Sequence, residues 1–279
     1  MCFLFLKRSR ITNYACPYYV GYCCFLGVQK FMPFTFSHPA AVLPILALPQ
    51  RWRSATGLIV GSMTPDFEKF IRMSTEDPYS HTWRSIFYFN LPLGLVLAFL
   101  FHLVIRDTLV KHSPVFVRQR FIRLLDFNWW KYFRKQYFVV VLSLLAGTIS
   151  HILWDSFTHK DGRGVQLLPF LEMELSGGED KLYLFEVLQT VSSVIGLAII
   201  LFFVFRLRKN PIREILSLAS LLTYWVGLLC GVMAVLTVRA NIGSGLDTQS
   251  LYHLSIPVIS AGMISLIIVS LYFKIVKPH

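Results

Sequence analysis

The chain has 279 residues, of which 55% are hydrophobic and 15% charged, and its formal net charge is +12. This composition excludes an ordinary soluble domain, which has about 25% charged residues, and the apolar blocks of about 20 residues indicate a helical membrane protein. The basic excess is typical of cytoplasmic loops that face anionic lipid. No nucleic-acid-binding motif accompanies it, so we expect no nucleic-acid partner.

Residues 1–31 mix apolar and basic stretches and show no clear signal-peptide cleavage pattern. The segment MPFTFSHPAAVLPIL, from Met32, reads like a natural protein start. We therefore predict that residues 1–31 are a dispensable extension or a misassigned start. Residues 32–279 are predicted to form a single integral membrane domain.

Two short apolar pieces follow, HPAAVLPILALP and ATGLIVGSM, separated by QRWR. Each is too short to cross a bilayer as a helix. They are expected to form a re-entrant hairpin, or a pair of short tilted helices that the other spans shield from lipid.

Longer apolar segments come next, and each is long enough to span a bilayer. The predicted spans are residues 85–105, 137–157, 187–205, 215–238 and 255–273. The sequence thus predicts an all-α, multi-pass transmembrane bundle of about five full spans plus the short N-terminal hairpin.

The charges of the connections predict the orientation. Connections 106–136 and 206–214 are rich in Lys and Arg, whereas 158–186 is mainly acidic and 239–250 carries a single basic residue, Arg239. Basic connections stay in the cytoplasm. We therefore predict a multi-pass protein of the inner (plasma) membrane, with the acidic connections facing the periplasm or exterior.

The stretch SHILWDSFTH places His151, Asp155 and His159 four residues apart at the end of the second span. On a helix this spacing puts all three on one face. Polar residues at a helix end often just meet headgroups and water, which suits His159. It suits His151 poorly, because that residue lies about two turns deeper among apolar neighbours.

The predicted orientation brings other ionisable residues to the same outer side. These are His38, Asp66, Glu68 and His81. Each one alone has an ordinary explanation, as a helix cap, a turn residue or an interfacial histidine. Their shared placement favours a metal site whose ligands are His38, Asp66, His81, His151, Asp155 and His159.

Nitrogen and oxygen ligands without thiolates suit a divalent metal, zinc first, with manganese or iron as alternatives. The five cysteines lack the spacing of a zinc site. More than four ligands are enough for a two-metal site. Glu68, or Asp66 where it is not a ligand, could act as the general base.

The blocks MPFTFSHPAAVLPIL, GLIVGSMTPDFEKF, PYSHT and ISHILWDSFTHKDG resemble the multi-pass bacterial family catalogued as domain of unknown function 4184. The resemblance extends from Met32 to the last span, and this family has no established activity. More distantly, the pattern is similar to membrane-bound metal-dependent hydrolases of bacteria and, more weakly, to the His-x3-Asp helix of zinc-dependent phospholipases C.

The hydrolase resemblance implies metal ligands at His38, Asp66, His81, His151 and Asp155. Glu68 stands where those hydrolases have a second Asp. YSHT replaces a fuller histidine block, so one ligand is missing, and His159 could compensate for it.

We therefore expect a membrane-embedded, metal-dependent hydrolase that acts on a lipid-linked or phosphoester substrate at the outer face. The alternative is a non-catalytic membrane protein, either a transporter or a metal-dependent assembly factor. The last three predicted spans contain no Asp, Glu, Lys, Arg or His, and this disfavours a transporter.

Overall fold

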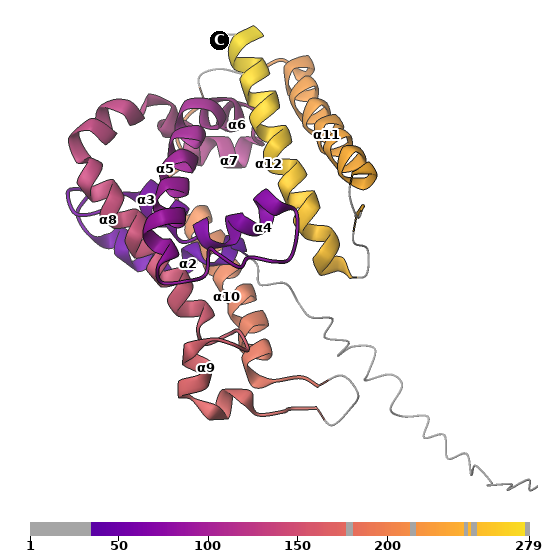
Figure 1. Cartoon of the computed structure of the whole chain (residues 1–279). Helices are drawn as coiled ribbons and strands as arrows, with labels where there is room; N and C mark the ends of the chain where they lie inside the picture. Colours follow the sequence, from indigo (N-terminus) through magenta and orange to yellow (C-terminus); the bar gives the residue numbers. More distant parts are fainter. Residues whose placement is uncertain (1–34, 177–180, 213–215, 243–244, 247–249, 277–279) are drawn as a thin grey trace, which may run out of the picture. The chain divides into compact units, whose positions relative to one another are not determined.

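The computed structural model describes residues 35–176, 181–212, 216–242, 245–246 and 250–276, and the predicted extension 1–31 lies outside them. Within the described residues the fold is helical and contains no β-strand (Figure 1). The α-helices are α2 (Pro39–Val42), α3 (Ala55–Gly61), α4 (Phe67–Arg72), α5 (Leu91–Leu100), α6 (Arg106–His112), α7 (Val115–Phe121), α8 (Trp129–Asp155), α9 (Arg163–Leu167), α10 (Leu184–Arg206), α11 (Leu218–Asn241) and α12 (Leu251–Val276).

Among the described residues, five helical segments are long and apolar enough to cross a membrane, as the sequence predicted. They are Ile86–His112, Trp129–Asp155, Leu184–Arg206, Leu218–Asn241 and Leu251–Val276. The first is α5 and α6 joined by π-helical turns, and it runs seven residues beyond the predicted end at 105. The protein is therefore a multi-pass helical membrane protein.

The two short apolar pieces form short helices. The first runs through Thr35–Ala47 as 3-10 turns flanking α2, and the second forms α3. Ser54 begins α3 by accepting a hydrogen bond from the Gly57 N–H at 3.2 Å. Its own N–H donates to Ser143 Oγ of α8 at 2.8 Å, which ties the start of α3 to the middle of a span.

Small residues allow α3 to lie directly on α8. A Cβ added to Gly57 would come within 2.8 Å of Ser143 Cβ, and one added to Gly61 or Gly147 would overlap the backbone of the other helix. Gly57 and Gly61 on α3, like Ser143 and Gly147 on α8, are four residues apart and share a helix face. This small-xxx-small pairing brings the two backbones into contact.

The two basic connections meet at one end of the bundle. The Asn210 N–H donates to the Gln119 carbonyl at 2.8 Å, and Arg120 donates to the Phe205 carbonyl at 3.2 Å. We call this the basic end. Helix α8 follows this end in the chain and bends at Gln136, whose backbone is non-helical. The part of α8 after the bend runs for about 28 Å to Asp155, so Asp155 lies at the opposite end.

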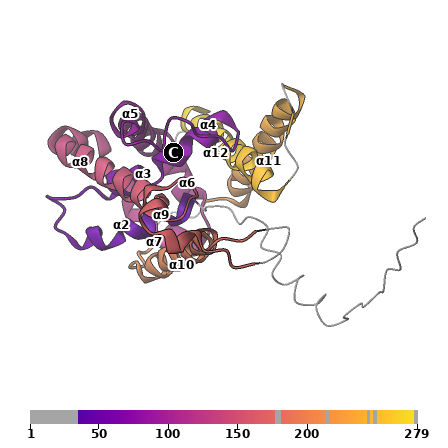
Figure 2. The same cartoon turned by 60° about the horizontal axis from the view of Figure 1, so that its bottom comes forward.

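Helices α11 and α12 pack side by side, as both views show (Figures 1 and 2). Gly231 allows the contact, because a Cβ there would overlap the Ser265 side chain. Ser265 Oγ donates to the Leu228 carbonyl at 2.7 Å. Helix α12 also packs against the short helix α4, which carries part of the candidate site.

Candidate metal centre

The end of α8 carries the first two residues of the site, His151 and Asp155. Both are buried, and His151 Nε2 lies 3.1 Å from Asp155 Oδ2. The helix ends at Asp155, so the prediction that His159 continues the same helical face is wrong. The chain turns back instead: the Val165 N–H bonds the Ser156 carbonyl at 3.0 Å, and Gly162 packs against Ser156 without room for a side chain.

Three residues from other segments join this pair. His38, just before α2, stacks on the His151 ring at 3.8 Å, and its Nε2 lies 3.7 Å from Asp155 Oδ1. Asp66 Oδ2, before α4, is 3.9 Å from His151 Nε2. His81 Nε2, in the segment leading to the first span, is 3.5 Å from Asp155 Oδ2 and 3.6 Å from Asp66 Oδ1. We call these five residues the His/Asp cluster.

Hydrogen bonds to the outer ring nitrogens orient two of the imidazoles. His151 Nδ1 lies 2.7 Å from the Ser62 carbonyl, which can only accept, so Nδ1 carries a proton. His81 Nδ1 lies 2.8 Å from Asp77 Oδ2. Both rings therefore direct Nε2 into the cluster, as in metal sites where a carboxylate or carbonyl holds the ligating histidine.

The contact between His151 and Asp155 depends on what lies between the two facing atoms. With its proton on Nδ1, a neutral His151 directs the Nε2 lone pair at a carboxylate oxygen 3.1 Å away. Two acceptors at that distance repel each other unless a proton or a metal cation binds between them. His151 Nε2, His81 Nε2 and Asp66 Oδ2 are all buried and without a hydrogen-bond partner among the described residues.

Lys69 is the buried cation beside the cluster. Its ammonium lies 3.1 Å from Asp66 Oδ1 and 3.0 Å from Asp77 Oδ2. Burial disfavours the charge of Asp66, but Lys69 and the neighbouring histidines hold the pKa of its carboxyl well below the usual range. Burial likewise opposes the Lys69 charge, and the two carboxylates outweigh it and raise the Lys69 pKa.

The same charges act on the histidines outside the spans. Burial, with His151 beside it, lowers the pKa of His38 to about 4, so this imidazole is neutral. Burial also disfavours protonation of His81, but the Asp155, Asp66 and Asp77 carboxylates outweigh it and raise the His81 pKa well above its ordinary value. With His81 protonated, the three carboxylates against two cations leave one negative charge, and they leave two once His81 gives up its proton.

Two predicted site residues lie outside the cluster. His159 is at its rim: Nδ1 is 3.9 Å from Asp155 Oδ1, Nε2 is 3.0 Å from the Gln189 amide nitrogen, and the side chain is 38% exposed. Glu68 bonds Arg72 at 2.9 Å and accepts from the Tyr79 and Ser80 N–H groups. Glu68 Oε2 thus holds the loop that carries His81, while Oε1 accepts from Arg72 on the same helix.

The family model described as domain of unknown function (DUF4184) matches residues 32–271. The chain belongs to this family. No curated protein and no solved structure matches it. The family match includes all the residues of the His/Asp cluster, and the family description assigns no activity to them.

Sequence reasoning missed three residues that support the cluster. Lys69 and Asp77 could have been found from their spacing, since Lys69 follows Asp66 by three residues and Asp77 precedes His81 by four. Asn90, fully buried at the start of the first span, donates to the Ser80 carbonyl at 2.8 Å. The sequence signal for Asn90 was a polar amide side chain inside an otherwise apolar span.

Proposed function

We propose that the His/Asp cluster binds one divalent metal ion and that the protein is a membrane-embedded, metal-dependent hydrolase. The observation that supports this most is the convergence of three imidazole nitrogens and two carboxylates from four separate segments, joined by contacts of 3.1–3.9 Å. The atoms that face the cluster, His81 Nε2 and Asp66 Oδ2, have no hydrogen-bond partner among the described residues.

One ion is favoured over two, because both possible ligand groups need the same His151 nitrogen, Nε2. Two atoms bound about 2.1 Å from the same ion lie about 3.0 Å apart at a right angle and about 3.4 Å apart at the tetrahedral angle. On opposite sides of the ion they lie about 4.2 Å apart. The contacts within the cluster fall inside this range. The two possible ligand groups, His38–His151–Asp155 and Asp66–His81–His151, share His151, whose Nδ1 is bonded to Ser62.

The donor set suits Zn²⁺, Mn²⁺ or Fe²⁺. A six-coordinate ion, as Mn²⁺ and Fe²⁺ prefer, would have to draw the two groups of three together to bind all five residues. Zinc, usually four-coordinate with one open position in catalytic sites, would bind with two of the five residues outside its ligand shell. Metal analysis of the purified protein distinguishes these cases.

A bound ion of this kind lowers the pKa of a water molecule and polarises an ester or phosphoryl oxygen. The protein residues supply the rest. Lys69 and Asp77 hold Asp66 and His81 in place. His159 lies at the exposed rim, 3.9 Å from Asp155, and is placed to exchange a proton with the solvent.

The position of the cluster favours a substrate at the membrane surface. The cluster lies at the end of α8 opposite the basic end, and basic connections stay in the cytoplasm. We therefore place it at the periplasmic or outer face of the inner membrane. A buried site at that depth suits the headgroup of a lipid-linked or phosphoester substrate.

Metal binding is tested first, on the full chain purified in detergent, by elemental analysis. We expect about one ion per chain in the wild type and a near-complete loss in His151→Ala and Asp155→Asn. His102→Gln is the matched control, because His102 is also buried in a span but stacks on Trp129 at 4.4 Å near the basic end. Equal metal content in all four proteins, or none in the wild type, would refute the metal site.

Hydrolysis is tested by incubating the loaded protein with a bacterial lipid extract and following the lipids by mass spectrometry. The wild type should convert one lipid class to its hydrolysis products, and Asp155→Asn should leave it intact. Metal binding without any such conversion would refute the hydrolase and support the non-catalytic alternative.

A further inference from the structure

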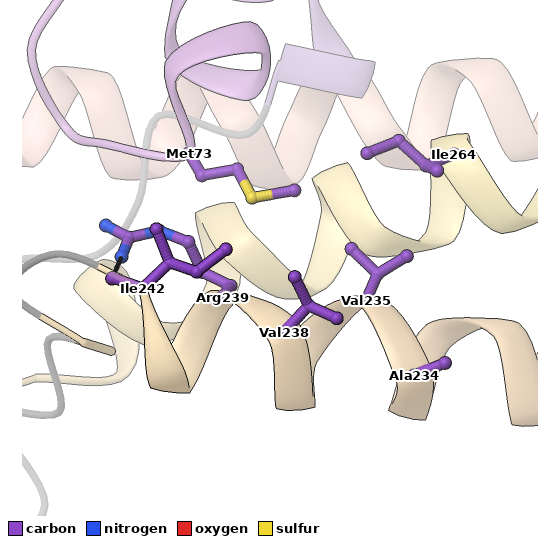
Figure 3. A pocket seen from close by; sticks show the side chains of 7 residues that line it. All are labelled: Met73, Ala234, Val235, Val238, Arg239, Ile242 and Ile264. Atoms are coloured by element: carbon purple, nitrogen blue, oxygen red, sulfur yellow. Dashed lines mark hydrogen bonds between the residues drawn. The ribbon is translucent and has the colours of Figure 1, made fainter.

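A groove opens between α11 and α12 (Figure 3). Met73, directly after α4, closes a third side of it, and the groove encloses about 410 Å³. This is within the range of about 300–1,000 Å³ found for ligand pockets. Its lining residues are Met73, Ala234, Val235, Val238, Arg239, Ile242 and Ile264.

The groove begins where the tight contact between the two helices ends. Gly231 packs on Ser265, and every α11 residue that lines the groove follows Gly231 in the chain. In Figure 3 the Met73 side chain lies over the two helices, and the valines point into the space beneath it. Apart from Arg239, the lining side chains are apolar, so the groove offers an apolar ligand no competing hydrogen bonds.

Arg239 lies at the end of the groove and near the end of α11. Its Nη1 donates to the Ile242 carbonyl at 3.1 Å. A guanidinium has five N–H donors, so this bond leaves it able to bind an anion as well. Arg239 is the only Lys or Arg between residues 214 and 250. It lies at the end of α11 that, by the positive-inside rule, faces away from the cytoplasm, where basic residues are few.

We propose that this groove binds one acyl chain of an anionic phospholipid, whose phosphate pairs with Arg239. The apolar walls and the single guanidinium match the two parts of such a lipid, an aliphatic chain and a negatively charged phosphate next to it. A zwitterionic lipid has the same chain but no net charge to offer the guanidinium. The proposal does not depend on the metal centre, although Met73 links the groove to helix α4.

The experiment uses the full chain in nanodiscs of dioleoyl phosphatidylcholine. A trace lipid carries a photoreactive diazirine on its acyl chain and has either a phosphatidylglycerol or a phosphatidylcholine headgroup. After illumination, labelled peptides are mapped by mass spectrometry. We expect the phosphatidylglycerol probe to label residues around Met73 and 234–242 about fivefold more than the phosphatidylcholine probe, the effect of one basic residue on an anionic lipid.

Two variant pairs test the groove and the charge separately. Val238→Trp fills the groove and should abolish the focused labelling, whereas Val226→Trp, on the same helix, outside the groove and similarly exposed, should not (57% and 54%). Arg239→Gln should remove the preference for phosphatidylglycerol, and Arg239→Lys should keep most of it. Equal labelling by both probes, or labelling that Val238→Trp leaves unchanged in a protein that elutes like the wild type, would overturn the proposal.

Discussion

The contact between α3 and α8 predicts an unequal response of two helical glycines to alanine. Gly61 lies on α3, where an added Cβ would overlap the Leu144 backbone, and backbone cannot turn aside as a flexible side chain can. Gly262 lies on α12, where a Cβ would meet no atom within 4 Å. The same substitution should therefore destabilise the protein at one position and not at the other.

The magnitudes follow from these two environments. Overpacking costs about 1–3 kcal/mol, so Gly61→Ala should lower the free energy of unfolding by that amount. Gly262→Ala should be neutral or stabilising by up to about 1 kcal/mol, since alanine is the better helix former. For a chain of this size, each kcal/mol shifts the Tm by about 2–4 °C.

The displacement of α3 should also reach the candidate site. The Ser62 carbonyl, directly after α3, holds His151 Nδ1, and Thr148 Oγ1 bonds the Gly61 carbonyl at 3.2 Å. Thermal unfolding in detergent and metal content are measured for both variants. A Gly61→Ala protein with the Tm and metal content of the wild type would refute the packing argument, as would an equal loss in Gly262→Ala.

Three further predictions concern the ligands and the topology. Asp77→Asn should weaken metal binding about 10- to 100-fold in a chelator competition titration, since Asp77 orients His81, and the exposed Glu76→Gln should not. Metal affinity should rise with pH, because the raised pKa of His81 keeps this ligand protonated in the metal-free protein and binding must release that proton. A metal titration in weak buffer that detects no proton release would contradict this prediction. In a cysteine-free background, Lys160→Cys and Arg123→Cys should react with an impermeant thiol reagent from opposite sides of the membrane, and labelling from the same side would refute the topology.

The sequence alone was sufficient for the fold class and the spans. Apolar segments of spanning length depend only on local composition, and all five appear as helices. Their ends were less predictable. The first span continues through Arg106 to His112, because Arg106 is buried and donates to the Phe127 carbonyl, a partner 21 residues away that composition does not reveal.

The sequence also determined which residue types gather on one side of the bundle, because alternating spans and charged connections assign each residue an end. His38, Asp66, His81, His151 and Asp155 were all predicted in this way. Only the tertiary structure decided which of the candidates meet. Glu68 turns to the backbone of the His81 loop, and His159 falls beyond the helix end.

The physical reason is that the site depends on contacts between segments far apart in the chain. Gly57 and Gly61 let α3 approach α8, and this approach alone sets the 2.7 Å bond from the Ser62 carbonyl to His151. The groove beside Arg239 likewise exists only because α4, α11 and α12 pack together. Local sequence thus determined which groups gather at one end of the bundle, and helix packing decided their distances and partners.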